Sequence, residues 1–313
     1  MPVAANYVKL LARAERALGR NSPVEAVSKV RSIIGPRNIP DSEAQAQRAL
    51  EILRNGEVPT PQQLTALEIV VRLLRPVVLV RNGQIGDLPE TTNQDLRSPE
   101  LKDAWSVFQT ITKQSVGSIG RIEDGGGRHV GTGFVVGEGR VATNRHVLAA
   151  LSCGSDVLVP GGARIVFKQE YIETNSPVDV AALTEVVAVH PVKDVAILCA
   201  ETGGRRPILF SDKVLPEGTN VVAIGFPGKD EINNPLFLTS VFGGKFGVKS
   251  AALGEVLDGS ADSDIFHDCS TTQGNSGSPV FVLATGQVSG IHRSGYFMYR
   301  NEAVSSAEIR TLF

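Results

Sequence analysis

Residues 271–279 read Thr-Thr-Gln-Gly-Asn-Ser-Gly-Ser-Pro, and this stretch decides how the second half of the chain is interpreted. It places Ser276 between Gly274 and Gly277, and glycines can turn successive backbone amides toward one point. A serine hydroxyl acts as a nucleophile only when a base takes its proton and N–H donors stabilise the oxyanion that forms. The pattern therefore makes Ser276 the candidate nucleophile, with the N–H groups of Gly274 and Ser276 as the candidate oxyanion hole.

A serine of this kind needs a base and a carboxylate that orients the base, and both have candidates upstream. His146 ends the run Val-Ala-Thr-Asn-Arg-His of residues 141–146, and Asp194 stands immediately before the apolar run 195–198. The order His, Asp, Ser, with separations of 48 and 82 residues, is one of the orders in which this triad has arisen on unrelated folds. We therefore predict His146 as the general base, Asp194 as its partner and Ser276 as the nucleophile.

Three other histidines and all three cysteines lack a catalytic pattern. His190 is a rival base, but Pro191 beside it and its position close to Asp194 favour a structural role in a loop. We expect His129 and His267 to be structural or exposed. The cysteines are odd in number and far apart, without the spacing of a disulfide framework or a zinc site: Cys153, Cys199 and Cys269. No cofactor and no metal are expected.

The composition argues against several classes of protein. The chain has 313 residues, of which 42% are hydrophobic and 20% charged, enough for one or two domains with a buried core. With 31 basic and 33 acidic residues the formal charge is −2, which argues against a nucleic-acid or polybasic membrane binder. No run approaches the roughly 18 apolar residues that cross a bilayer. We therefore expect a soluble cytoplasmic protein that binds neither nucleic acid nor membranes.

The two halves of the chain differ in hydrophobic periodicity. Up to about residue 75 apolar residues recur at three- and four-residue spacings, which predicts four short helices, the last opened by the capping-box sequence Thr60-Pro-Gln-Gln63. Asn82-Gly83 predicts a turn after a short strand. Beyond residue 115 the period becomes two, which is typical of a β-barrel or sandwich. The β-like runs are residues 115–122, 133–136, 157–159, 163–167, 178–189, 195–199, 221–224, 279–282 and 288–292.

These patterns predict a multi-domain chain in which a small all-α helical bundle precedes an all-β domain. We expect residues 1–90 to form a helical adaptor or regulatory domain and residues 91–114 to form a linker and a helix. Residues 115–313 then form the domain that carries the candidate triad. No residue of the helical part stands out as a catalytic acid, base or nucleophile, so a packing or docking module is expected there.

Five short motifs, taken together, resemble one known family. They occur in the family's order along residues 115–313: Gly131-Thr-Gly-Phe134, Thr143-Asn-Arg-His146, Asp194-Val-Ala, Gly274-Asn-Ser-Gly-Ser-Pro279 and Gly290-Ile-His292. The chain resembles the trypsin/chymotrypsin-like serine endopeptidases, and within them the glutamyl endopeptidases of staphylococcal type. The resemblance implies a chymotrypsin-like double β-barrel, with His146 and Asp194 on the first barrel and Ser276 on the second. It also implies a protein or peptide substrate, bound in the cleft between the barrels.

The resemblance suggests a substrate preference. In the glutamyl endopeptidases a threonine five residues before the nucleophile and a histidine after the last long strand line the specificity pocket, and these match Thr271 and His292. The position six residues before Ser276, where a trypsin-like pocket has Asp, is Ser270. We therefore expect cleavage after Glu, with Gln or Asp as alternatives. Arg293 departs from the family's pattern, and either adds positive charge to the pocket or points to solvent.

Control of activity is expected to come from the helical part. Asn275 stands where zymogen-type relatives have an Asp that pairs with a newly cut N-terminus, so that mode of activation is not expected. Residues 1–90 are similar in architecture to the adaptor or effector-associated domains of bacterial defence proteases, which suggests a protein partner.

Two alternatives stay open at this stage. One is a catalytically silent scaffold with a protease fold, used for binding. The other is an HtrA-type quality-control protease, but Ser278 stands where that group usually has Gly, and the chain offers no room for a PDZ domain after His292.

Overall fold

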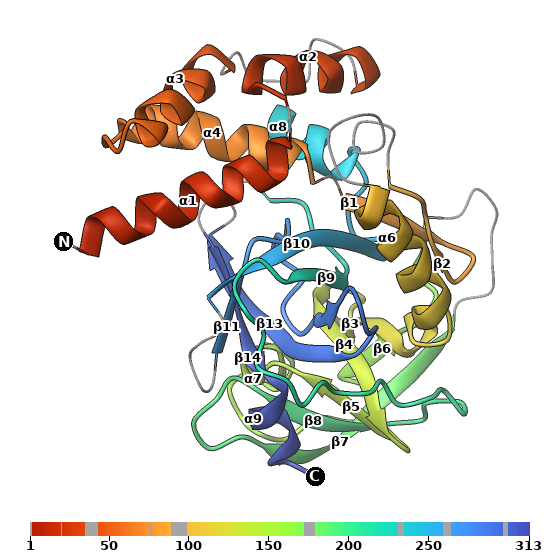
Figure 1. Cartoon of the computed structure of the whole chain (residues 1–313). Helices are drawn as coiled ribbons and strands as arrows, with labels where there is room; N and C mark the ends of the chain where they lie inside the picture. The colour runs from red at the N-terminus through yellow and green to blue at the C-terminus, as the bar shows by residue number, and fades with distance from the viewer. Residues whose placement is uncertain are drawn as a thin grey trace. The chain divides into compact units, whose positions relative to one another are not determined.

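The computed structural model describes residues 2–19, 21–34, 43–75, 77–88, 99–171, 179–230, 235–258, 264–296 and 300–313. The chain forms two compact units, one helical and one built mainly of strands (Figure 1). The helical unit holds Met1–Val77, Asp87–Trp105 and Glu231–Gly244, and the strand unit holds Val78–Gly86, Ser106–Asp230 and Lys245–Phe313. The units therefore interleave along the chain, and the division at about residue 90 stays a prediction.

The helical unit is built from helices whose apolar faces meet. They are α1 (Pro2–Leu18), α2 (Pro23–Ile34), α3 (Glu43–Arg54), α4 (Pro61–Leu73) and α8 (Pro235–Phe242), and α6 (Pro99–Thr112) begins in the same unit. Ala49, Leu50 and Leu67 are buried where α3 packs on α4. The sequence did not predict α8, because its short and mostly apolar stretch has no helical period. Of the helices in the described ranges, none combines the length and the apolar character required to span a bilayer.

Two local features stabilise α4. The predicted capping box is present, because the Gln63 N–H donates to Thr60 Oγ1 and the Thr60 N–H donates to the Gln63 side chain. On the buried face, Glu68 is ion-paired with Arg13 at 2.6 Å and with Arg72 at 2.7 Å. Burial alone raises the pKa of Glu68, but the two guanidinium groups outweigh it and hold the pKa below its ordinary value. The carboxylate therefore stays charged inside the bundle.

The first half of the strand unit is a closed six-stranded antiparallel barrel. Its strands, in barrel order, are β3 (Ile119–Asp124), β4 (His129–Gly137), β5 (Arg140–Thr143), β8 (Ala196–Ala200), β7 (Val180–Val189) and β6 (Ala163–Val166). Alternate side chains such as Ile122, Val141 and Leu198 are fully buried in one core. A short helix, α7 (Arg145–Leu151), follows β5.

One predicted strand of this region is wrong. Residues 157–159 form no strand, and Val157 and Val159 are 68% and 66% exposed. The Gly162 N–H donates to the Val159 carbonyl at 2.8 Å and closes a turn. Three residues of valine and leucine have β propensity, but no partner strand is present to bury both faces.

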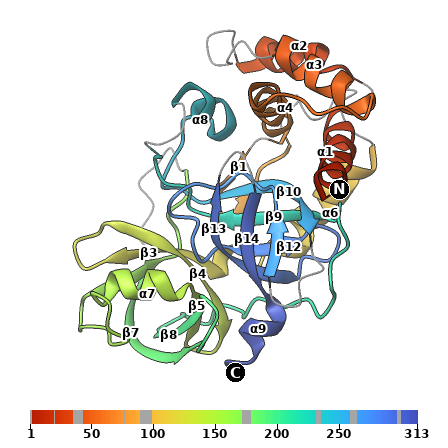
Figure 2. The same ribbon diagram turned by 90° about the vertical axis from the view of Figure 1, so that its left-hand side faces the viewer.

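The second half of the strand unit is also a closed ring of six strands. Its order is β11 (Asp264–His267), β14 (Arg300–Ser305), β13 (Val288–Tyr296), β12 (Pro279–Val282), β9 (Asn220–Gly225) and β10 (Ser250–Asp258), and β10 pairs back to β11. Figure 2 shows the two barrels from the side. The predicted fold class, a helical bundle followed by a chymotrypsin-like double β-barrel, is confirmed. A last short helix, α9 (Ser306–Arg310), follows β14.

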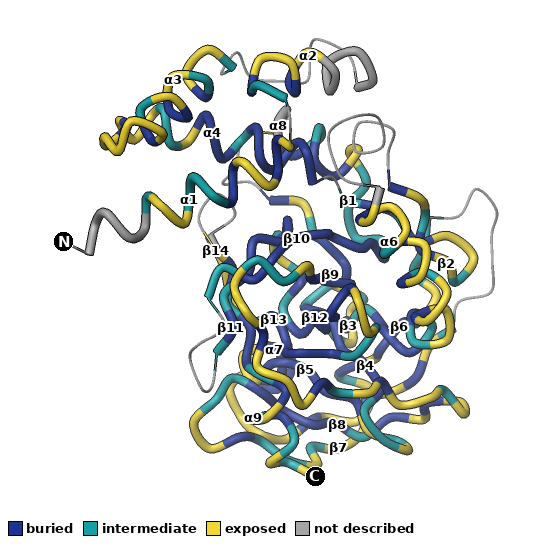
Figure 3. Tube along the Cα trace, in the orientation of Figure 1, coloured by how far each residue is buried: buried dark blue, intermediate teal, exposed yellow. Residues whose placement is uncertain are grey.

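A hairpin from the N-terminal half extends the second barrel's sheet. Strands β1 (Val77–Arg81) and β2 (Gln84–Ile85) form it, and the Val80 N–H donates to the Lys249 carbonyl beside β10 at 3.0 Å. The turn residues Asn82 and Gly83 have φ angles of 51° and 72°, the left-handed conformation of an Asn-Gly turn, so the predicted turn is confirmed. Burial along the chain follows this architecture, with the strands of both barrels largely buried (Figure 3).

Candidate active site

The structure brings two of the three predicted triad residues into direct contact. His146 lies in the first turn of α7, directly after β5, and Asp194 lies in the loop between β7 and β8. The Nδ1 atom of His146 is 2.7 Å from Asp194 Oδ2, and the His146 backbone N–H donates to Asp194 Oδ1 at 3.0 Å. The Asn144 side chain donates to the Asp194 carbonyl at 2.8 Å. One carboxylate oxygen thus contacts the imidazole and the other accepts from the backbone of the same residue.

The protonation of this pair follows from its hydrogen bonds. Burial raises the pKa of Asp194, but hydrogen bonds from His146 and the charges of His146 and Arg293 hold it below its ordinary value. Because a carboxylate can only accept, the proton between the two side chains belongs to His146 Nδ1. In the neutral form of the ring, His146 Nε2 then carries no proton, and the His146 side chain is 50% exposed. This nitrogen can take a proton from a neighbouring hydroxyl.

Ser276 lies in the loop before β12, where two glycines adopt left-handed conformations. The φ angles of Gly274 and Gly277 are 93° and 91°. Three amides of this loop donate to carbonyls: the Asn275 N–H to Thr272 at 3.1 Å, the Gly277 N–H to His292 at 2.8 Å and the Ser278 N–H to Asn275 at 2.9 Å. Within the described residues, the N–H groups of Gly274 and Ser276 donate to no protein acceptor.

These two amides are the ones that the sequence proposes as an oxyanion hole, and that role stays a prediction. Because a peptide group is planar and trans, the Gln273 carbonyl and the Gly274 N–H point in opposite directions. The Gln273 carbonyl accepts from the Gly228 N–H at 2.5 Å. The two donors therefore remain available to a bound oxyanion.

Two threonines of the first barrel hold the serine loop through backbone and side-chain hydrogen bonds. The Thr132 N–H donates to the Ser276 carbonyl at 2.7 Å, and Thr132 Oγ1 donates to the Gly274 carbonyl at 2.8 Å. Thr143 Oγ1, at the end of β5, donates to the Thr132 carbonyl at 2.8 Å. The serine loop thus lies against β4 and β5, the strand that leads to His146. Among the described residues, no hydrogen bond joins the Ser276 hydroxyl to the His146 imidazole, a bond that often tightens only in the substrate complex.

The predicted specificity residues are buried in the second barrel. Thr271 is 4% exposed and His292 is 3% exposed. Within the described chain the buried Ser270 hydroxyl has no hydrogen-bond partner. Burial, and then the neighbouring His267 and His146, hold the pKa of His292 well below its ordinary value, so its ring is neutral.

The sequence did not predict the contact that His267 makes in this region, and it left two orientations open for Arg293. His267, expected to be structural or exposed, is fully buried, and its Nε2 atom is 3.4 Å from His292 Nδ1. Its spacing along the chain contained no signal, because the contact depends on β11 and β13 sharing one barrel. Arg293 was expected to add charge or to point to solvent. It is ion-paired with Glu302 at 2.8 Å and Asp264 at 3.5 Å, so its charge is already matched.

A groove of about 430 Å³ opens beside His146. Its lining is Arg145, His146, Ala149, Val192, Lys193, Asp194 and Arg293. The half-exposed imidazole of His146 therefore lies at the wall of this groove. No three side chains of the types His, Cys, Asp and Glu gather as a metal site in the part of the chain that the structure describes.

Comparisons with curated proteins point to one family. The curated serine proteases MT3772 and Rv3671c, from two strains of Mycobacterium tuberculosis, are each 30% identical over 173 residues. That segment covers 51% of this chain and 35% of each relative, so the chain matches about a third of the relatives' length.

Solved structures of similar chains include the Rv3671c protease in its inactive form, at 21% identity with a TM-score of 0.46, covering 69% of this chain and 94% of that one. They also include Deg5, at 20% identity with a TM-score of 0.47, covering 68% of this chain and 94% of that one. A model of the trypsin-like peptidase domain matches residues 131–291, more than half of the chain, and this span contains His146, Asp194 and Ser276. The chain therefore belongs to the trypsin-like peptidase domain family.

Proposed function

We propose that the chain is a serine endopeptidase that hydrolyses peptide bonds through Ser276, His146 and Asp194. The observation that carries this proposal is the His146–Asp194 pair, in which Asp194 contacts Nδ1 of a half-exposed imidazole that lines the groove. The free N–H groups of Gly274 and Ser276 on the adjoining loop support it.

The proposed reaction proceeds in two steps. His146 Nε2 takes the Ser276 hydroxyl proton while the oxygen attacks the peptide carbonyl carbon, and the N–H groups of Gly274 and Ser276 bind the resulting oxyanion. Asp194 stabilises the imidazolium, which then gives its proton to the leaving amine. A water molecule, with His146 again as base, hydrolyses the acyl-enzyme and releases the carboxylic acid. No cofactor or metal has a role in this scheme.

A fluorophosphonate probe tests the nucleophile. We expect the wild-type protein to be labelled on Ser276 and Ser276→Ala to lose the label together with turnover, by about 10⁶-fold. Ser278→Ala is the matched control, because its buried hydroxyl contacts Asn275 rather than the groove, and it should keep the label. A folded wild-type protein that takes no label would overturn the proposal and favour the alternative of a catalytically silent scaffold.

We propose that cleavage follows Glu, with Gln or Asp as alternatives. The support is a set of buried hydroxyl and imidazole groups at the resembled pocket positions, Ser270, Thr271 and His292. A neutral imidazole and two hydroxyls donate hydrogen bonds to a carboxylate or a carboxamide without a fixed positive charge. A peptide library varied at the residue before the cut measures this preference. A preference for Lys, Arg or large apolar residues would remove the model.

We propose further that the helical part, residues 1–90, recruits a protein partner or controls the peptidase, in a cytoplasmic defence role. The resemblance in architecture supports this. A truncation that starts after residue 75 tests it, because it keeps the β1–β2 hairpin that pairs with the second barrel. Unchanged partner capture and unchanged activity in the truncated protein would contradict the proposal.

A further inference from the structure

The loop that carries Asp194 is closed around the imidazole of His190. His190 follows the last residue of β7 and is 7% exposed. Its Nδ1 atom accepts the N–H groups of Val192 at 3.2 Å and Lys193 at 2.8 Å. The backbone N–H of His190 donates to the Val195 carbonyl at 3.0 Å, which joins the two ends of the loop. Since Nδ1 accepts twice, the proton of the neutral ring lies on Nε2.

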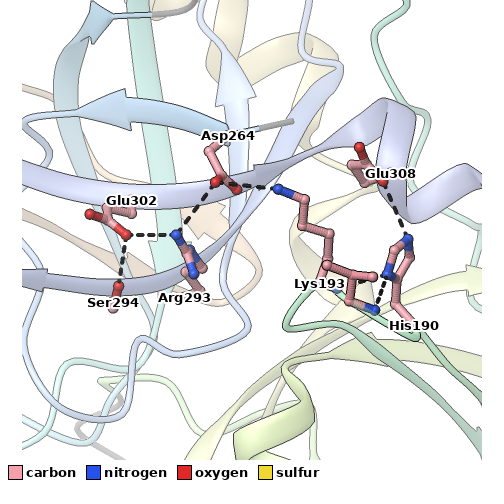
Figure 4. Close-up of polar contacts among 8 residues, drawn as sticks. His190, Lys193, Asp264, Arg293, Ser294, Glu302 and Glu308 are labelled. Carbon is pink, nitrogen blue, oxygen red and sulfur yellow. Dashed lines mark hydrogen bonds and ion pairs between the residues drawn. The ribbon is translucent and has the colours of Figure 1, made fainter. Parts of the chain in front are cut away.

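The other side of the same ring faces the second barrel. His190 Nε2 is 3.3 Å from Glu308 Oε2, on helix α9 (Figure 4). Helix α9 is itself anchored, because Ile309 is fully buried and Ser306 Oγ donates to the Ser211 carbonyl at 2.6 Å. One imidazole therefore joins the Asp194 loop of the first barrel to a fixed helix that follows the last strand of the second.

A second contact joins the same loop to the same barrel. Lys193 Nζ lies 3.4 Å from Asp264 Oδ2 on β11, and that oxygen also lies 3.5 Å from Arg293 on β13 (Figure 4). The Lys193 and Asp264 side chains are each 20% exposed, so solvent screens the pair less than a surface pair. The backbone N–H of Lys193 is also one of the two that His190 holds.

We propose that His190 is a positioning residue for Asp194. With Glu308, Lys193 and Asp264 it forms an interbarrel clasp that sets the Asp194–His146 pair of the first barrel against the Ser276 loop of the second. This inference rests on the proposed function. The clasp acts on Lys193, the residue directly before Asp194, and displacing a catalytic group by about 1 Å is enough to lower a rate about 10²-fold.

Two substitutions of His190 separate its two contacts. The amide oxygen of Asn occupies the place of Nδ1 and can accept the loop N–H groups, but Asn is too short to reach Glu308. Ala removes both contacts. We expect His190→Ala to lower kcat about 10- to 100-fold with little change in KM, and His190→Asn to recover most of the loss. If His190 only stabilised the loop, His190→Ala would lower the melting temperature without lowering kcat at a constant KM.

Glu308 offers a milder test, with a control at another ion pair of helix α9. Glu308→Gln keeps an oxygen acceptor for Nε2–H and should retain kcat, whereas Glu308→Ala and Lys193→Met should each lower it several-fold. Asp212→Ala removes the ion pair between Asp212 and Arg310 of α9 without touching the loop, and should leave kcat unchanged. Glu308→Ala and Lys193→Met change partly exposed side chains, so they still test the clasp if His190→Ala does not fold.

A readout independent of turnover separates this inference from the proposed function. We expect the proton on His146 Nδ1, hydrogen-bonded to Asp194, to give a downfield imidazole resonance in the NMR spectrum of the full chain. We expect His190→Ala and Glu308→Ala to shift or broaden it, His190→Asn to shift it less than His190→Ala does, and Asp212→Ala to keep it. An unchanged resonance together with unchanged kcat in folded Glu308→Ala and Lys193→Met would overturn the clasp. A wild-type protein without fluorophosphonate labelling would overturn only the proposed function, because the resonance still reports on Asp194.

Discussion

The backbone N–H of Thr132 donates to the carbonyl oxygen of Ser276 at 2.7 Å, so a strand of the first barrel holds the loop that carries the candidate nucleophile. The same residue's hydroxyl holds the carbonyl of Gly274. The two barrels therefore meet through backbone groups of the candidate oxyanion hole. The geometry of the hole depends on how β4 and this loop lie against each other.

Thr132→Val should weaken both stability and catalysis. Valine keeps the shape but removes the hydroxyl that donates to the Gly274 carbonyl, and the loss of one such hydrogen bond costs about 0.5–1.5 kcal/mol in free energy of unfolding. We expect kcat to fall with little change in KM, measured with urea unfolding and a peptide substrate. Thr112→Val removes a similarly buried hydroxyl that bonds within α6, and should cost stability without affecting kcat.

Gly274→Ala should remove most activity. A Cβ atom there would stand 2.3 Å from Cε1 of His129 and 2.6 Å from the Phe226 carbonyl, at a φ of 93° that alanine rarely adopts. The loop must shift, and losing one oxyanion donor lowers kcat about 10²- to 10³-fold. Gly154→Ala, at a φ of 85° with open space around it, measures backbone strain alone. Equal activity of the two variants would argue against an oxyanion role for Gly274.

Asp194→Asn should lower kcat about 10⁴-fold, because an amide donates to His146 Nδ1 and favours the wrong tautomer. The substitution should also alter the acid limb of stability. The folded-state pKa of Asp194 lies below its ordinary value of 3.8, so its contribution is present above that pH and is lost as the pH falls through the folded value. Urea unfolding between pH 3 and pH 6 should show a smaller decline for the variant than for the wild-type protein.

Lys249 should make stability rise at alkaline pH. Its ammonium is fully buried against the carbonyls of Val116 and Phe167, and burial lowers its pKa from 10.5 to about 8, against the opposing charge of Glu170. Between these two values the unfolded chain binds more protons than the folded chain, so the free energy of unfolding rises with pH.

Lys249→Met is the variant that isolates this effect. We expect the difference in unfolding free energy between wild type and variant to change in favour of the wild type from about pH 8 to pH 10.5 and to level off beyond it. A difference that stays constant across this range would show that the lysine is not titrating inside the folded protein.

Much of the fold was predictable from local patterns. The helical period, the capping box at Thr60 and the Asn82-Gly83 turn each depend on residues a few positions apart, and the structure confirms them. The run at residues 157–159 was predicted wrongly, because a strand needs partners that three apolar residues do not specify. Strands β10, β11 and β14 are absent from the predicted β-like runs, because closure of the barrel buries them and their own sequences show no alternating pattern.

The candidate site also combines residues that the sequence predicted with contacts that it did not. The motifs located His146, Asp194 and Ser276, and the structure adds the contact between the first two while their roles stay proposals. Sequence placed His190 in a loop but gave no sign of Glu308, which lies more than one hundred residues away along the chain. It also left the charge of Arg293 unassigned, and the ion pairs with Asp264 and Glu302 now account for it.

What the sequence by itself determined is the set of local elements and the order of the reactive residue types, because periodicity, turns and glycine placement act over a few residues. Only the tertiary structure decided which distant side chains touch. Closing a barrel sets the register of all its strands at once, and this brings His267 beside His292, Lys193 beside Asp264, and Thr132 against the Ser276 loop. Such contacts depend on the cooperative pairing of many strands, which no single segment of the chain encodes.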